Sequence, residues 1–175
     1  NSRLLEYLKH RKEKCVQESM QKSFHFDYEL HATWENLMES DKQLVELAFE
    51  AMHLAYAPYS EFKVGSAVRL SNGLTLKGNN QENIAYPSGL CAERVVLFYA
   101  GANFPQESIE TICIVARGDL MPSEFLLSPC GSCRQVMLET ENRQSKKIRV
   151  IIVNQDNRTM VLHSVKDLLP FGFGK

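Results

Sequence analysis

Three cysteines and one glutamate stand at spacings that suit a metal-dependent hydrolytic site. Cys91 is followed two residues later by Glu93, and a second segment carries Cys130 and Cys133 as a Cys-x-x-Cys pair. A catalytic zinc ion usually takes three protein ligands and leaves its fourth position open for water, whereas a structural zinc takes four. No second Cys-x-x-Cys precedes these cysteines and no His-x-x-x-His follows them. The pattern therefore favours a catalytic zinc, with Glu93 as a carboxylate that moves protons.

Other readings of the same residues are open. Cys130 and Cys133 could form a redox pair, because Cys-x-x-Cys also occurs in thioredoxin-like proteins. That reading leaves Cys91 and Glu93 unexplained. Glu93 taken alone could be a first-turn helix glutamate that interacts with the helix dipole. The five histidines fit no ligand spacing with the cysteines, and we expect most of them to be surface or packing residues.

Five stretches of the chain match one known pattern in order. They are residues 56 to 65 (YAPYSEFKVG), 80 to 86 (NQENIAY), 91 to 94 (CAER), 129 to 136 (PCGSCRQV) and 168 to 170 (LLP). A Cys-x-Glu followed by Pro-Cys-x-x-Cys is typical of the three-cysteine zinc deaminases of nucleobases. The chain resembles the free-nucleoside, homotetrameric cytidine deaminases of the cytidine and deoxycytidylate deaminase family over about the last three-quarters of its length.

The resemblance implies zinc-dependent hydrolytic deamination of cytidine and 2′-deoxycytidine to uridine and 2′-deoxyuridine, with release of ammonia, in pyrimidine salvage. It implies one Zn²⁺ per subunit on Cys91, Cys130 and Cys133, with Glu93 carrying protons from water to the ring nitrogen and the leaving amine. It also implies a homotetramer with composite active sites. Two alternatives stay open: a deaminase of another small aminated heterocycle, such as blasticidin S, and a non-catalytic, zinc-stabilised binding module.

Two residues beside Glu93 extend the predicted site. Both cysteine segments are expected at helix N-termini, where the dipole and free N–H groups favour thiolates. Three thiolates leave a zinc site with net negative charge, so Arg94 could donate to them, and the resemblance implies the same role. The alternative is a surface arginine on a helix. The small side chain of Ala92 lets the backbone approach the base closely.

The resemblance also implies a set of substrate contacts. Asn80 and Glu82 match the pair that binds the ribose 3′-hydroxyl, and residues two apart on an extended segment point to the same face. Taken alone, both are ordinary turn residues. Phe62 matches a phenylalanine that lines the base and sugar pocket, although a strand phenylalanine is more often a core residue. Phe173 matches an aromatic residue that reaches a neighbouring subunit's active site, and Phe171 could fill the same role.

Composition limits the class of protein. A chain of 175 residues suits one domain with a sizeable core. A net charge of −1 and a pI of about 6.6 do not indicate the basic face that nucleic-acid binding needs. No apolar run reaches membrane-spanning length and no signal peptide opens the chain. The cysteine count of five is odd and three of the five are spaced for a metal, so we expect a reducing, cytoplasmic compartment. The resemblance implies a small-molecule nucleoside as the partner, with no nucleic acid and no membrane. Residues 1 to 39 are predicted to be an N-terminal extension of unknown role, and residues 40 to 175 the catalytic domain.

Local signals give the first elements of that domain. The segment from Ser40 to Gln43 has the form of a capping box and predicts the start of a helix, which Pro58 ends. The Asn-Gly pair at residue 72 predicts a hairpin. Its two strands are expected at residues 62 to 70 and 74 to 77.

The remaining elements alternate. Helices are predicted from Cys91 to Gly101 and from Cys130 to Glu141, and strands at residues 111 to 116, 148 to 153 and 160 to 162. The β-α-β-α-β order predicts parallel neighbours joined by crossovers. The last two strands are too close in sequence for a crossover, so they should be antiparallel. We therefore expect a three-layer α/β/α fold of the cytidine deaminase type, with a mixed five-stranded sheet.

Overall fold

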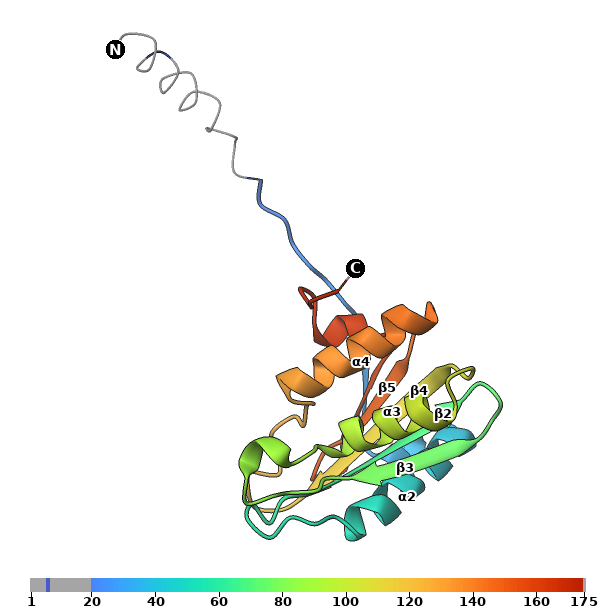
Figure 1. The fold of residues 1–175 in the computed structure, drawn as a ribbon, viewed down its shortest axis with the longest axis vertical. Helices are drawn as coiled ribbons and strands as arrows, with labels where there is room; N and C mark the ends of the chain where they lie inside the picture. Colours follow the sequence, from blue (N-terminus) through green and yellow to red (C-terminus); the bar gives the residue numbers. More distant parts are fainter. Residues whose placement is uncertain (1–5, 7–19, 175) are drawn as a thin grey trace.

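The computed structural model describes residue 6 and residues 20 to 174, and it shows one sheet with helices on both faces (Figure 1). The sheet has six strands in the order β1-β6-β5-β4-β2-β3. Their bounds are β1 Tyr28–His31, β2 Lys63–Leu70, β3 Thr75–Asn79, β4 Ile109–Arg117, β5 Arg149–Val153 and β6 Thr159–Leu162. Helix α2 (Glu39–His53) covers one face, and α3 (Ala92–Asn103) and α4 (Gly131–Gln144) cover the other. The predicted three-layer α/β/α class is confirmed.

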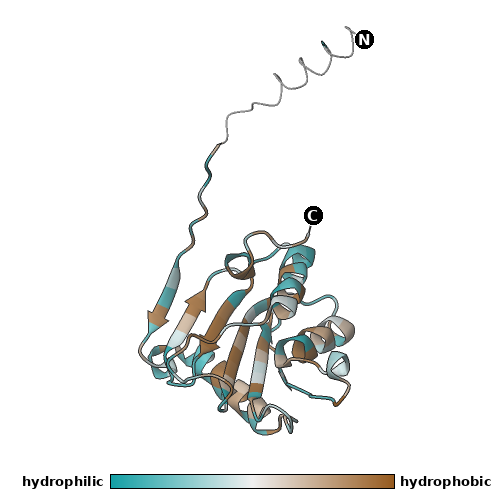
Figure 2. Ribbon diagram, turned by 90° about the vertical axis from the view of Figure 1, so that its left-hand side faces the viewer, coloured by the Kyte–Doolittle hydropathy of each residue, from teal (hydrophilic) through white to brown (hydrophobic). Residues whose placement is uncertain are grey.

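The central strands are largely apolar along their length (Figure 2), and buried side chains form a core on each side of the sheet. In β4, Ile112 and Ile114 pack with the residues of α3 and α4, whereas Cys113 and Val115 pack towards α2. Successive side chains of a strand point to opposite faces, so one continuous apolar run serves both cores. The two helices that carry the predicted cysteines therefore rest on the same face of the sheet.

Helix α2 does not begin at the predicted capping box. Its N-cap is Met38, which makes no side-chain cap hydrogen bond, and Ser40 lies inside the first turn. Asp41 in that turn is fully buried and forms ion pairs with Arg69 and Arg149. The prediction was wrong because tertiary ion pairs, which a local pattern does not contain, decide how this end of the helix sits.

The predicted hairpin is confirmed. Strands β2 and β3 pair antiparallel, and Gly73 between them has φ of 84°, a conformation that glycine adopts without steric cost. The side chain of Asn72 accepts a hydrogen bond from the N–H of Leu74 at 2.9 Å. Asn and Gly thus perform the two tasks for which turns select them.

Fewer neighbouring strands are parallel than the element order predicted. Strands β4 and β5 are parallel neighbours joined through α4, as expected. Strand β2 lies between β3 and β4 and is antiparallel to both, so the strands joined through α3 are not neighbours. Strands β5 and β6 are antiparallel, which confirms the prediction from their short connection.

A sixth strand, β1, extends the sheet beyond the five that we predicted. It pairs antiparallel with β6, with Tyr28 opposite Leu162. The short 3₁₀ helix η1 (Trp34–Asn36) follows it, and Leu37 is buried in the core under α2. Within the predicted extension, residues 28 to 37 thus pack on the domain, whereas residues 1 to 5 and 7 to 19 lie outside the described residues. The division of the chain at residue 40 stays a prediction.

The helices of the described part of the chain are short. None of them is both long enough and apolar enough to cross a bilayer.

Candidate metal centre and active site

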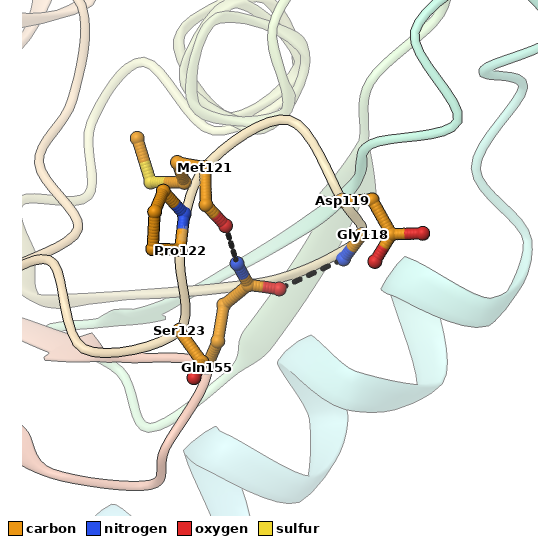
Figure 3. A pocket seen from close by; sticks show the side chains of 6 residues that line it. All are labelled: Gly118, Asp119, Met121, Pro122, Ser123 and Gln155. Atoms are coloured by element: carbon orange, nitrogen blue, oxygen red, sulfur yellow. Dashed lines mark hydrogen bonds between the residues drawn. The ribbon is translucent and has the colours of Figure 1, made fainter.

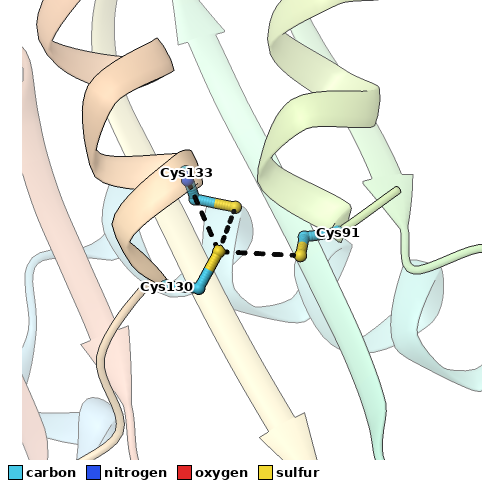
Figure 4. Close-up of side chains that lie close together, drawn as sticks. All are labelled: Cys91, Cys130 and Cys133. Atoms are coloured by element: carbon cyan, nitrogen blue, oxygen red, sulfur yellow. Dashed lines mark hydrogen bonds between the residues drawn. The ribbon is translucent and has the colours of Figure 1, made fainter. Parts of the chain in front are cut away.

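The three predicted cysteines come together at two helix N-termini, as Figure 4 shows. Cys91 is the N-cap of α3 and Cys130 is the N-cap of α4. Cys133 lies in the first turn of α4, where its backbone N–H donates to the Cys130 sulfur at 3.5 Å. Free N–H groups and the positive end of the helix dipole therefore surround the sulfur atoms, which favours thiolates.

The sulfur positions fit one zinc ion. The Cys130 sulfur lies 3.4 Å from the Cys133 sulfur and 3.9 Å from the Cys91 sulfur. All three lie within 4.8 Å of one another, and among the described residues they form the one such group of three potential ligands. Tetrahedral zinc with bonds of about 2.3 Å places thiolate sulfurs about 3.8 Å apart. Only small shifts separate this arrangement from a three-sulfur zinc site.

The thiols differ in acidity. A hydrogen bond from Cys133 lowers the pKa of Cys91 to about 5; burial opposes this shift and Arg94 adds to it. The same hydrogen bond raises the pKa of Cys133, and burial acts in the same direction. The cluster thus already holds a thiolate at neutral pH, and the thiolate is the form that binds metal.

Glu93 is buried next to the cysteines, with 4% of its surface exposed. It is the second residue of α3, two residues beyond the Cys91 N-cap. Burial raises the pKa of Glu93 to about 7, with a further contribution from the charge at Cys91. A carboxyl group in such a place can take up a proton and release it again near neutral pH.

Arg94 lies beside Cys91, as the sequence predicted for a residue that stabilises the thiolates. Its Nη2 group is 3.9 Å from the Cys91 sulfur. Its Nε atom is buried and has no hydrogen-bond partner within the described part of the chain. The guanidinium therefore contributes a positive charge to a cluster of negative sulfur atoms.

Asn80 is buried, and both ends of its amide bind the backbone next to the start of β2. Its Nδ2 donates to the carbonyl of Phe62 at 2.9 Å, and its Oδ1 accepts from the N–H of Val64 at 2.8 Å. The backbone of Asn80 also binds Val64 and Tyr56. Asn80 therefore fixes the start of β2. Each end of its side-chain amide can still form one further hydrogen bond.

Glu82 holds a neighbouring turn. Its carboxylate accepts hydrogen bonds from the N–H of Tyr59 at 2.9 Å, the N–H of Ser60 at 3.3 Å and the hydroxyl of Ser60. Burial is the largest single influence on the pKa of Glu82 and raises it, but the three hydrogen bonds together outweigh burial and lower the pKa. Gln81 between Asn80 and Glu82 pairs with Leu90 through two backbone hydrogen bonds. The segment predicted to bind ribose is thus attached directly to the residue before Cys91.

The other predicted site residues are divided between the core and the surface. Ala92 is fully buried at the start of α3, and Phe62 is 8% exposed within the core cluster shared with α3 and α4. Phe173 lies on the segment that follows the 3₁₀ helix η3 (Val165–Leu168), where 88% of its surface is exposed. Phe171 is exposed as well, at 95%.

Sequence reasoning missed two residues that support the site. Ser60 binds Glu82, and Arg134 donates to the carbonyl of Pro129 at 2.8 Å and to the hydroxyl of Ser128 at 2.6 Å. Arg134 thereby fixes the loop that presents Cys130. Its place directly after Cys133 was a usable signal, because a first-turn side chain can reach back to the loop before its helix.

A hollow of about 380 Å³ lies elsewhere, beside the loop after β4 (Figure 3). Gln155 braces that loop, because its amide accepts from the N–H of Gly118 at 2.8 Å and donates to the carbonyl of Met121 at 2.9 Å. None of the predicted site residues lines the hollow. The candidate site is therefore the cluster of thiols beside a buried carboxyl group, which can do chemistry, and not this hollow.

Comparison with known families places the same residues within one recognised region. A family model described as "Cytidine and deoxycytidylate deaminase zinc-binding region" matches residues 38 to 160. That range contains both cysteine segments, Glu93 and the segment from Asn80 to Glu82.

Individual proteins are similar over most of the described chain. A cytidine deaminase of Sporosarcina psychrophila is 34% identical over 138 residues, which is 79% of this chain and 93% of that protein. A cytidine deaminase of Mycobacterium tuberculosis is 33% identical over 73% of this chain and 84% of its own length. The crystal structure of cytidine deaminase from Burkholderia pseudomallei superposes with a TM-score of 0.65 at 36% identity, covering 75% of this chain and 98% of that one.

Proposed function

Because the chain belongs to the cytidine and deoxycytidylate deaminase family, we propose that it deaminates cytidine and 2′-deoxycytidine to uridine and 2′-deoxyuridine, releasing ammonia, in pyrimidine salvage. The observation that carries the proposal is the convergence of three cysteine sulfurs, from two helix N-termini, beside the buried carboxyl group of Glu93. The reaction is a hydrolysis, so the protein needs a way to activate water and a way to move its protons.

Cys91, Cys130 and Cys133 are the residues that would hold a zinc ion, and the spacing of their sulfur atoms fits the zinc-binding region that the family model describes. A bound zinc ion supplies a Lewis acid that makes water a nucleophile near neutral pH. Arg94 offsets the negative charge of the three thiolates. Without that positive charge, the net negative charge of three thiolates would make the metal site a weak Lewis acid.

Glu93 moves the protons. It accepts one proton from the attacking water and delivers it to the ring nitrogen of the pyrimidine. It then takes the second proton of that water from the new C4 hydroxyl group and gives it to the amine, which leaves as ammonia. Burial keeps bulk water away from this carboxyl group, so the proton stays at the reacting centre.

The ribose and base are bound by the segments that surround the cysteines. Asn80 and Glu82 face the sugar through the hydrogen-bonding capacity that their backbone contacts leave free. Phe62 forms a wall of the base pocket, and the fully buried Ala92 lets the start of α3 approach the base.

The ring of Phe173 is exposed, as a side chain that meets a site on another chain would be. This supports a homotetramer in which active sites are shared between subunits. Free thiols at Cys91, Cys113, Cys130 and Cys133 support a reducing, cytoplasmic location.

The test is ammonia release from cytidine by purified, zinc-loaded protein, with blasticidin S and other aminated heterocycles measured beside it. A nucleoside deaminase should release ammonia from cytidine and deoxycytidine, and Asn80→Ala should raise KM for both. Turnover of another heterocycle but not of cytidine would move the function to that substrate. A zinc-loaded protein that turns over none of them would be a binding module.

A further inference from the structure

The backbone after η3 is attached to α4 by a two-way hydrogen bond with one side chain. Gln135 donates from Nε2 to the carbonyl of Phe173 at 2.6 Å, and its Oε1 accepts from the N–H of Phe173 at 3.1 Å. Both ends of a single amide are therefore bound to one backbone residue. In Figure 1 this segment, drawn in red, turns back beside α4. We call residues 169 to 174 the tail.

Two glycines of the tail lie in close contact with α4. A Cβ atom added at Gly172 would collide with Leu138 of α4 and would lie 3.0 Å from a methyl carbon of Leu169. A Cβ atom added at Gly174 would lie 3.0 Å from the side chain of Asn142. Positions 135, 138 and 142 are three and four residues apart, so they share one face of α4. That face is the surface on which the tail lies.

A second side chain joins the last residue of η3, directly before the tail, to the loop that presents Cys130. Arg134 donates to the carbonyl of Leu168 at 3.0 Å with the same guanidinium that binds Pro129 and Ser128 before Cys130. The two residues that follow Cys133 thus hold both the loop that presents a zinc ligand and the tail. The backbone of the tail is restrained, yet the rings of Phe171 and Phe173 stay exposed.

We propose that Gln135 is a positioning residue that holds the tail against α4 and thereby sets where the ring of Phe173 meets the nucleoside. The inference rests on the proposed function, in which Phe173 contributes to a composite site. It assigns Gln135 no contact with substrate: Gln135 acts through the backbone of Phe173, and Gly172 lets that backbone come close enough to be held.

The experiment compares Gln135→Ala with Glu139→Ala, a matched truncation of an exposed side chain on the same helix. Each neutral hydrogen bond lost should weaken an equilibrium about fivefold, so KM for cytidine should rise about five- to twentyfold in Gln135→Ala. Its kcat and zinc content should match the unmodified protein, and Glu139→Ala should leave all three unchanged. Gly172→Ala, which displaces the tail by collision, should reproduce the rise in KM.

A double-mutant cycle separates positioning from general damage. If Gln135 acts through the ring of Phe173, Gln135→Ala should add almost nothing to the KM of Phe173→Ala. An equal rise in KM in both backgrounds would overturn the proposal, as would an unchanged KM in Gln135→Ala. Hydrogen exchange at the Phe173 amide is a second measurement, and it does not depend on activity. If this amide stays protected in Gln135→Ala, the proposal is also overturned.

The failure of this inference differs from the failure of the proposed function. If the unmodified protein deaminates cytidine but Gln135→Ala keeps its KM, only the positioning role is refuted. If zinc-loaded, unmodified protein releases no ammonia from cytidine, the proposed function fails and the inference fails with it.

Discussion

One buried carboxylate ties α2 to the sheet, and its removal should have a large effect on stability. Asp41 is fully buried and accepts hydrogen bonds from Arg69 at 3.1 Å and from Arg149 at 2.5 Å. Asp41→Asn keeps the volume but leaves two guanidinium groups without a counter-ion. Removing one partner of a buried ion pair costs about 3–5 kcal/mol. The two arginine side chains keep 20% and 29% of their surface exposed. Water can therefore replace part of the loss, and we expect about 2–3 kcal/mol.

That loss corresponds to a fall in Tm of about 5–10 °C for a chain of this size. Urea unfolding at a fixed excess of zinc is the assay, because bound metal stabilises the folded state by mass action. Glu39→Gln is the matched control: Glu39 pairs with Lys42 at 3.7 Å on the surface of the same turn. An exposed pair of this kind contributes less than about 1 kcal/mol. Equal unfolding midpoints for Asp41→Asn and Glu39→Gln would refute the reasoning.

Further predictions concern the site. Arg94→Gln should lower the affinity for zinc about tenfold, measured in competition with a chelator. This is the lower end of the effect of a residue that binds a metal ligand, because the contact between Arg94 and the Cys91 sulfur is long, at 3.9 Å. Unchanged affinity would contradict the role given to Arg94. The lowered pKa of Glu82 means that its carboxylate adds stability above its ordinary value of 4.5 and loses it as the pH falls through the lowered value. Urea midpoints of the unmodified protein and Glu82→Gln should therefore differ at pH 7 and converge below pH 4.5, and a gap independent of pH would exclude this origin. A chelator should lower the Tm of the unmodified protein but not of Cys130→Ser, which should already lack the metal.

The candidate site could be predicted in large part because its signals are local. The spacing of Cys91, Cys130 and Cys133 already predicts three metal ligands, with Glu93 beside the first of them. The residues after each N-cap have the apolar spacing of a helix. Two helices that begin at ligands, on the same face of one sheet, then bring the sulfurs together.

What could not be predicted depends on contacts between distant segments. Tyr28 joins the sheet only because β6 offers it an edge, and residues 28 to 31 carry no motif that names that partner. The predicted capping box at Ser40 failed because the arginines that hold Asp41 come from β2 and β5.

The binding residues show the same limit. Sequence spacing placed Asn80 and Glu82 on one segment, but it could not show that their side chains are bound to the backbone around β2 and Ser60. The attachment of the tail to Gln135 joins residues 38 positions apart, which no local pattern contains.

The most direct test of the account is Glu93→Gln, measured for ammonia release from cytidine together with zinc content. The variant keeps the shape of the side chain but cannot carry a proton, so we expect zinc to stay bound at one ion per chain while turnover falls at least about 10²-fold. Turnover close to that of the unmodified protein, with zinc bound, would contradict the assignment of Glu93 and the mechanism built on it.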